Sequence, residues 1–234
     1  MPALLQLKQI SKSFGPVQAL NGVDFAIEAG EVVGLIGENG AGKSTLMNLL
    51  GGMLQPTSGT ISLDGTPVKI TDAISAAQRG ISFVHQELNL LDNLNVAGNI
   101  FLGREPRRYG CIDEGKLAAM TQPLLDQLGL DIAPDQSLVP LTNGQKQLVE
   151  IAKALSMDAR ILILDEPTSS LTIQETDTLL KLVETLRERG MAIIFITHRL
   201  TEIEKVANRV VALRDGELAG HLTRAETNRD AMIS

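Results

Sequence analysis

The feature that most constrains the fold of this chain is the glycine-rich segment Gly37-Glu38-Asn39-Gly40-Ala41-Gly42-Lys43-Ser44. It matches the pattern G-x-x-x-x-G-K-[ST], in which backbone N–H groups surround phosphate oxygens. It follows an apolar run, Val32–Ile36, and leads into a helix-like segment, Ser44–Leu50. Strand, glycine loop and helix in this order predict an α/β fold whose loop binds a nucleotide triphosphate.

The residue types in this loop predict specific roles. Lys43 would reach the β- and γ-phosphates, and the Ser44 hydroxyl would ligate Mg²⁺. Thr45, the next residue, is also predicted to bind the nucleotide. The alternative is a glycine-rich turn that binds nothing. The pattern arises by chance in roughly one chain in a hundred of this length, and its flanks favour the nucleotide site.

Composition limits the class of protein. The chain has 234 residues, of which 44% are apolar and 3% aromatic, so an aliphatic core is expected. A net charge of −7 argues against a nucleic-acid-binding protein, which usually has a basic face. One cysteine, Cys111, excludes an internal disulfide, and we interpret it as inert. No apolar run approaches the ~18 residues of a membrane span, so we expect a soluble, cytoplasmic protein.

The pattern of apolar residues predicts a parallel sheet in the second half of the chain. Two apolar runs, Ile161–Leu164 and Ala192–Ile196, flank a helical pattern from Ile173 to Leu186 that Gly190 would end. This β-α-β order implies parallel strands with a right-handed crossover. Two short strands near the C-terminus would turn at Asp215-Gly216.

The first half and the middle of the chain have different patterns. Residues 3–27 alternate like antiparallel strands with turns at Gly15-Pro16 and Asn21-Gly22, and residues 59–70 resemble a hairpin. From about residue 88 to 157 the pattern is helical with no clear strand. We expect a break or kink at Pro123.

Polar residues follow three of the predicted strands. Asp165 would hold Mg²⁺, and Glu166 would accept or orient a proton of the attacking water. His198 would contact the transferring phosphoryl group, and Gln86 would contact both Mg²⁺ and that water. The alternatives are a solvated acidic loop, a structural histidine and an ordinary polar glutamine.

Thr142, Asn143, Gly144 and Gln145 precede a predicted helix from Lys146 to Leu155. Thr142 or Asn143 could simply cap that helix. The glycine-backed helix N-terminus could equally form a second anion site for a γ-phosphate. Spacing does not separate these two interpretations.

Taken in order, the glycine loop, Gln86, Leu141–Gln145, Ile161–Pro167 and His198 resemble the ATP-binding cassette (ABC) ATPases over nearly the full chain. The resemblance implies a P-loop NTPase (RecA-like) α/β core with a mostly parallel sheet, an N-terminal antiparallel β subdomain and a helical insert. Residues 1–86 and 158–234 would form the core, and residues 87–157 the helical subdomain.

Three further segments resemble the ATPases of ribose/galactose/xylose-type sugar importers: His85–Leu90, Asn99–Glu105 and Gln147–Leu155. Those proteins carry two cassettes in one chain. The terminal Asn228–Ser234 resembles the end of a first cassette, so we expect an N-terminal fragment.

The resemblance also implies ligands and partners. The ligands are ATP and Mg²⁺, and Phe14 would stack on adenine, with a core phenylalanine as the alternative. The partners are a second cassette, in the same chain or a homodimer, and transmembrane permease subunits at the cytoplasmic face of the cell membrane. A periplasmic or extracellular sugar-binding protein would act indirectly, and no nucleic acid is expected.

Two residues depart from the family pattern. Thr142 stands where the family usually has Ser, and Thr172 stands where many cassettes have Asp. The sequence therefore predicts an ATP-hydrolysing motor domain of a sugar importer. The alternatives are a regulatory cassette that hydrolyses poorly and a nucleoside importer. A nucleic-acid-linked cassette conflicts with the acidic charge, and a GTPase would need an Asn-Lys-x-Asp motif.

Overall fold

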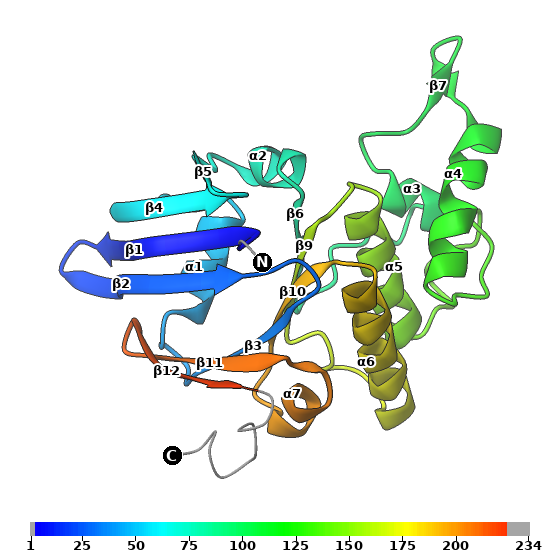
Figure 1. The fold of residues 1–234 in the computed structure, drawn as a ribbon. Helices are drawn as coiled ribbons and strands as arrows, with labels where there is room; N and C mark the ends of the chain where they lie inside the picture. The colour runs from blue at the N-terminus through cyan, green and yellow to red at the C-terminus, as the bar shows by residue number, and fades with distance from the viewer. Residues whose placement is uncertain (1–2, 224–234) are drawn as a thin grey trace.

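The computed structural model describes residues 3–223, and its centre is a six-stranded sheet (Figure 1). The strand order is β12-β11-β3-β10-β9-β6, parallel except for the β11–β12 hairpin. The bounds are β3 Val32–Ile36, β6 Ile81–Val84, β9 Ile161–Asp165, β10 Ala192–Ile196, β11 Arg209–Arg214 and β12 Glu217–Thr223. The predicted parallel sheet is confirmed. Strands β3, β10 and β9 are almost wholly buried because helices and a second sheet cover them.

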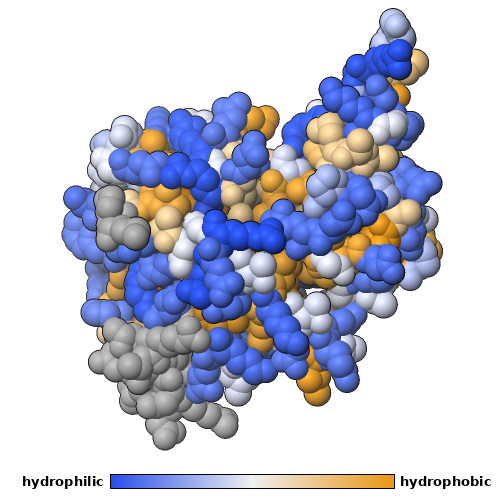
Figure 2. Space-filling model, turned by 45° about the vertical axis from the view of Figure 1, so that its right-hand side comes forward, coloured by the Kyte–Doolittle hydropathy of each residue, from blue (hydrophilic) through white to orange (hydrophobic). Residues whose placement is uncertain are grey.

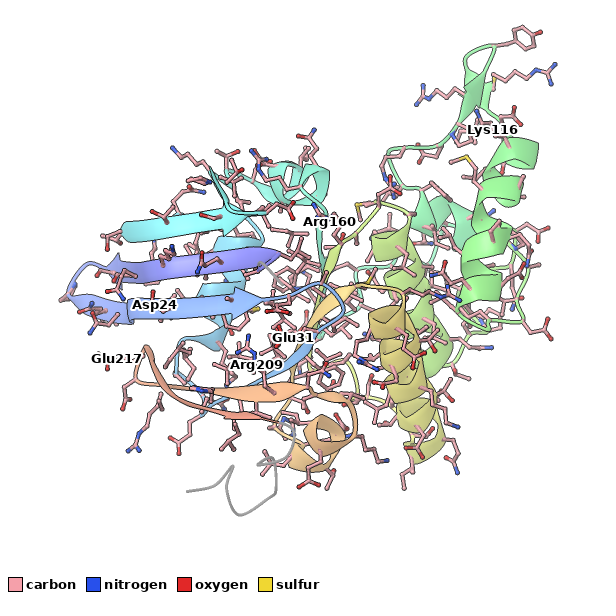
Figure 3. All side chains as sticks on the ribbon, in the orientation of Figure 1. Asp24, Glu31, Lys116, Arg160, Arg209 and Glu217 are labelled. Atoms are coloured by element: carbon pink, nitrogen blue, oxygen red, sulfur yellow. The ribbon has the colours of Figure 1, made fainter. Side chains whose placement is uncertain are left out.

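A second, antiparallel sheet has the order β2-β1-β4-β5. Its strands are β1 Leu5–Phe14, β2 Val17–Ile27, β4 Ser58–Leu63 and β5 Thr66–Val68. Asn21 of β2 donates to Glu217 of β12 at 2.6 Å. Arg209 of β11 pairs at 2.6 Å with Glu31, which lies in the connection from β2 to β3 (Figure 3). Arg209 also donates to the Ala26 carbonyl of β2. The antiparallel sheet is thus fixed next to the strand that precedes the glycine loop.

Seven helices lie within the described residues. Their bounds are α1 Lys43–Leu50, α2 Ala73–Gln78, α3 Val96–Ile100, α4 Glu114–Gln127, α5 Asn143–Leu155, α6 Ile173–Glu188 and α7 Leu200–Val206. Asp72 caps α2, Thr142 caps α5 and Thr172 caps α6 through side-chain oxygens. The helix predicted to end at Gly190 does so, and Gly129 follows the end of α4; both glycines have a positive φ that permits the chain to leave the helix.

Two apolar clusters make up most of the core. One joins α1 to the antiparallel sheet and to one face of the central sheet. The other joins α3, α4, α5 and α6 to the opposite face, where Leu162, Leu164, Ile193 and Phe195 point. The helical middle of the chain therefore shares its core with the sheet.

Three local expectations are wrong. Asn21-Gly22 is not a turn, because β2 continues through it with a register shift against β1, and the Gly22 N–H donates to Ser11 Oγ at 2.9 Å. The break expected at Pro123 does not occur, since α4 runs through it and the buried residues on either side pack against neighbouring helices. The middle of the chain also contains short strands, β7 Arg107–Arg108 and β8 Cys111–Ile112.

The β7–β8 hairpin projects from the helical part of the molecule (Figures 1 and 2). Its turn consists of Tyr109 and Gly110, which both have positive φ, as two-residue hairpin turns require. Cys111 is exposed on it. The segment Asn228–Ser234, which resembles the end of a first cassette, lies outside the described residues.

Candidate nucleotide site

The glycine loop between β3 and α1 is held by backbone on both sides. A Cβ at Gly42 would lie 2.7 Å from the Ala19 carbonyl oxygen of β2, and φ at Gly42 is +105°. A Cβ at Gly37 would collide with the Leu213 carbonyl oxygen of β11. The Gly216 N–H donates to the Ala41 carbonyl at 3.1 Å. Glycine is required because two other strands approach the loop too closely for any side chain.

Lys43 lies inside this loop. Its Nζ donates to the carbonyl of Gly37 at 2.6 Å and to that of Glu38 at 2.9 Å. No side chain caps α1, and its first turn contains no acidic residue. Its N-terminal N–H groups and the Lys43 ammonium therefore form a positive end that is suited to an anion. Glu38, Asn39, Gly40 and Ser44 are exposed around it, with Thr45 half-buried and Ala41 buried.

Asp165 and Glu166 lie at the carboxyl end of β9. Both are half-buried, and burial, followed by the neighbouring Glu166 charge, raises the pKa of Asp165, while His85 and Lys43 oppose that rise. Two adjacent carboxylates held out of bulk water are costly without a cation. This edge of the sheet is consequently suited to a metal ion or a cationic group.

Glu166 leaves the strand in a left-handed conformation with φ of +45°, which is unusual for a residue with a side chain. Its N–H donates to the Ile196 carbonyl of β10 at 2.9 Å, and its Oε1 lies 3.3 Å from Nδ1 of His198. The His198 side chain is largely exposed. The structure thus brings the predicted base and the predicted phosphate-contacting histidine together.

A buried network that the sequence analysis missed lies beneath this pair. Glu202 of α7 is 5% exposed and accepts from the hydroxyl of Thr168 at 2.7 Å and that of Thr197 at 3.2 Å. Arg199 bridges Glu202 Oε1 and the Thr168 carbonyl. The network links the loops after β9 and β10, which carry Glu166 and His198. Glu202 resembles a surface helix residue in sequence, so no signal in the sequence indicates this role.

Gln86 is exposed two residues beyond β6. Because Val84 pairs with Leu164 in parallel register, Gln86 follows β6 at the same sheet edge at which Asp165 and Glu166 follow β9. His85, which the sequence analysis did not select, stacks on Phe83 with ring centroids 4.8 Å apart and acts electrostatically on Asp165.

Phe14 ends β1 and is 46% exposed, so it is not a core residue. Lys12 Nζ lies 5.1 Å from the centre of its ring. An exposed ring on the sheet that adjoins the glycine loop is available for stacking, as an adenine contact would require.

Thr142, Asn143, Gly144 and Gln145 form the start of α5. Thr142 and Gln145 make a reciprocal capping box, which confirms the capping interpretation. The Gly144 N–H donates to Glu175 Oε1 of α6 at 3.2 Å. Within the described residues, the hydrogen bonds of this segment run to its own helix and to α6, not to the glycine loop.

The model of one family, described as ABC transporter, matches residues 20–169, which include the glycine loop, Gln86, Thr142–Gln145 and the end of β9. This chain belongs to the ABC transporter family.

Curated relatives cover nearly all of it. The chain is 46% identical over 230 residues to "Ribose import ATP-binding protein RbsA" of Corynebacterium glutamicum, covering 98% of this chain and 44% of the relative. It is 50% identical over 213 residues to "Putative ribose/galactose/methyl galactoside import ATP-binding protein 1" of Agrobacterium fabrum, covering 91% of this chain and 42% of the relative. The chain therefore spans less than half the length of these relatives.

Solved structures of other cassettes are also similar. One is an ATP-binding cassette of an ABC transporter in its ADP conformation, 25% identical with a TM-score of 0.85, over 97% of this chain and 94% of that one. Another is a dimeric cassette in a post-hydrolysis state bound to ADP and phosphate, 27% identical with a TM-score of 0.78, over 94% and 98% of the two chains. The expected α/β fold with an antiparallel β subdomain is confirmed, and the family supports ATP as the nucleotide.

The donor set fits Mg²⁺. Ser44, Gln86 and Asp165 would offer a hydroxyl, an amide and a carboxylate oxygen, which are the ligand types that this ion prefers. Within residues 3–223, no cluster of three or more His, Cys, Asp or Glu is available to hold a metal ion. An ion at this edge would therefore need phosphate oxygens and water as further ligands, as Mg²⁺ does at nucleotides. None of the described helices is long and apolar enough to span a bilayer.

Proposed function

We propose that this chain is an ATP-hydrolysing motor cassette of an importer that carries a sugar. The observation that carries the proposal is the pairing of Glu166 with His198 at the carboxyl end of the sheet that also carries the glycine loop. The sugar specificity rests on relatives whose names specify ribose and galactose import. The substrate itself would be selected by other subunits.

In this proposal, each residue of the site has one task. The loop N–H groups and Lys43 bind the β- and γ-phosphates, and Phe14 stacks on the base. Ser44, Asp165 and Gln86 would hold Mg²⁺, which would supply charge neutralisation at the phosphates when bound. Glu166 accepts a proton from the attacking water, and His198 contacts the γ-phosphate as charge develops. The products are ADP and inorganic phosphate.

A second cassette would complete the site. The family likeness favours head-to-tail pairing, in which the Thr142–Gln145 segment of one cassette meets the γ-phosphate bound to the other. That phosphate would then stabilise the closed pair, and hydrolysis would release it. Residues 87–157 would face the transmembrane permease at the cytoplasmic side of the membrane, and a sugar-binding protein would act through that permease.

The test is Mg²⁺-dependent ATP hydrolysis per chain across a wide range of protein concentration. We expect a specific rate that rises with concentration, because two copies must meet to complete a site. Hydrolysis that is absent at every concentration, and also with a second cassette added, would contradict the proposal. Omitting Mg²⁺ should remove the activity.

A further inference from the structure

The start of α5 already holds an anion, and that anion is a side chain of the same chain. Glu175, in the first turn of α6, directs Oε1 at the Gly144 N–H, 3.2 Å away. Its Oε2 accepts from the N–H of Thr172 at 3.0 Å and from the Thr172 hydroxyl at 2.9 Å. One carboxylate therefore joins the N-termini of two helices.

The electrostatics agree with this double role. Hydrogen bonds from the Thr172 N–H and then from the Thr142 hydroxyl hold the pKa of Glu175 below its usual value. The carboxylate is accordingly charged at neutral pH. The contact is also close, since a Cβ at Gly144 would lie 2.6 Å from Glu175 Oε1. The two residues that depart from the family pattern, Thr142 and Thr172, are both partners of this carboxylate.

We propose that Glu175 is a placeholder for the γ-phosphate: it occupies the Gly144 N–H in the single cassette and must release it when two cassettes close on ATP. The inference rests on the proposed function, in which this N–H meets a nucleotide bound to the partner cassette. Two anions cannot share one N–H donor, and like charges at that distance repel. The free energy of pairing two cassettes therefore includes the cost of moving Glu175 Oε1 away from the Gly144 N–H.

The structure has room for that movement. A cavity of about 360 Å³ lies between α5 and α6, lined by Glu175 and by apolar side chains such as Leu148 and Leu179. Gln147, which lines the same cavity, is 3% exposed, and its Nε2 has no hydrogen-bond partner among the described residues. The cavity thus offers space next to the carboxylate, and its lining includes a residue with an unused donor, while Oε2 can stay on Thr172 as the cap of α6.

The decisive variant is Glu175→Gln, which keeps an acceptor for Thr172 but removes the charge. It is made in a Glu166→Gln background, so that bound ATP persists, and ATP-dependent self-association is measured by sedimentation over a range of protein concentration. We expect the midpoint of association to fall about tenfold, because a charged hydrogen-bond partner no longer competes. The thermal unfolding temperature of Glu175→Gln should fall slightly or not change, since the cap is weakened.

Two controls separate this effect from others. Glu188→Gln removes the same charge from the exposed end of α6 and should leave the midpoint unchanged. Thr172→Ala weakens the α6 cap but leaves the carboxylate, and should not tighten association. A merely structural Glu175 would change stability and association in the same direction.

The outcomes are distinct. An unchanged or higher midpoint for Glu175→Gln, with ATP binding intact in a titration, overturns the inference but not the proposed function. If the Glu166→Gln protein fails to associate both with and without Glu175→Gln, although both forms bind ATP, the inference is also overturned, because the carboxylate would not be what keeps the copies apart. If neither of these two variants binds ATP, the proposed function is contradicted, and the inference that rests on it is contradicted as well.

Discussion

The molecule contains two helix N-termini suited to anions, and they are built differently. At α1, the loop ending in Gly42 is fixed by the carbonyl oxygens of β2 and β11, and no side chain caps the helix. At α5, Thr142 caps the helix and the Gly144 N–H is taken by Glu175. The first end is open and rigid, whereas the second is satisfied by a side chain that can rotate away.

This difference shows how one chain can hold a permanent site beside a conditional one. Backbone that is packed against backbone cannot rearrange without moving a whole strand, so the phosphate loop is preorganised. A hydrogen bond to a flexible glutamate side chain can be exchanged at the cost of one rotamer change. The α1 end is thus suited to permanent nucleotide binding, and the α5 end to a contact that forms only in a pair.

The largest effect should come from the rigid end. Lys43→Ala removes the ammonium inside the phosphate loop, and we expect ATP affinity to fall by about a hundredfold or more, since a charge-assisted contact to phosphate is lost. A binding titration measures this. Lys69→Ala, which changes an exposed lysine, is the matched control. ATP affinity equal to that of the unchanged protein would remove Lys43 from the site.

The next largest effect is expected for Glu166→Gln, at the sheet edge where β9 ends. We expect ATP to bind normally while phosphate release slows by about a hundredfold or more, as is typical when a general base is removed. Glu204→Gln, an exposed acid of α7, should hydrolyse ATP at the normal rate. Near-normal phosphate release by Glu166→Gln would show that another group takes the proton.

These two residues were predictable because their signals are local. The G-x-x-x-x-G-K-[ST] pattern specifies its own strand and helix, and an acidic pair after four apolar residues marks a strand end. The parallel β9-α6-β10 unit followed from two apolar runs and one helical pattern for the same reason. The strand order and the pairing of Glu166 with His198 were not predicted and come from the structure, because both depend on how distant segments pack.

The rest depends on residues far apart in sequence. Glu175 is 31 positions from Gly144, and Glu202 is 34 positions from Thr168. Each is an acid in the first turn of a helix, where a carboxylate is common for local reasons. The errors at Asn21-Gly22 and Pro123 have a related cause, since packing against neighbouring strands and helices overrode a local turn or break signal.

Replacing one glycine by alanine in the phosphate loop, and one at the start of α5, tests the comparison directly. Gly42→Ala would place a Cβ against the Ala19 carbonyl oxygen at an unfavourable φ, so we expect a loss of about 2–4 kcal/mol in the free energy of unfolding. Gly144→Ala meets the Glu175 side chain from Cγ to Oε1 rather than backbone, and because that side chain can rotate away the change should cost less than about 1 kcal/mol. Chemical denaturation measures both.

Equal costs for the two variants would contradict the contrast between a rigid and an exchangeable region. A further variant refines it: adding Glu175→Ala should relieve any cost of Gly144→Ala, because the colliding side chain is then absent. The same addition should not rescue Gly42→Ala, whose obstacle is backbone.

The smallest effect is expected on α5 itself. Glu150 is 6% exposed, its Oε1 has no hydrogen-bond partner among the described residues, and Lys153 lies 3.9 Å away. Burial raises the pKa of Glu150 above its usual 4.5, so the folded state binds the proton more tightly than the unfolded chain does. The charged form therefore destabilises the fold at neutral pH, and that cost disappears as the pH falls below the raised pKa.

At neutral pH, Glu150→Gln should thus unfold at a slightly higher temperature than the unchanged protein. Its free energy of unfolding should be higher by no more than about 1 kcal/mol. The difference should shrink as the pH approaches the usual glutamate value of 4.5. Glu184→Gln, which breaks a half-buried pair with Arg187, is the control and should not show the same gain. A Glu150→Gln variant that is less stable at neutral pH would mean that Lys153 compensates the buried charge. In that case α5, like the phosphate loop, would be fixed along its length, and only its first turn would be exchangeable.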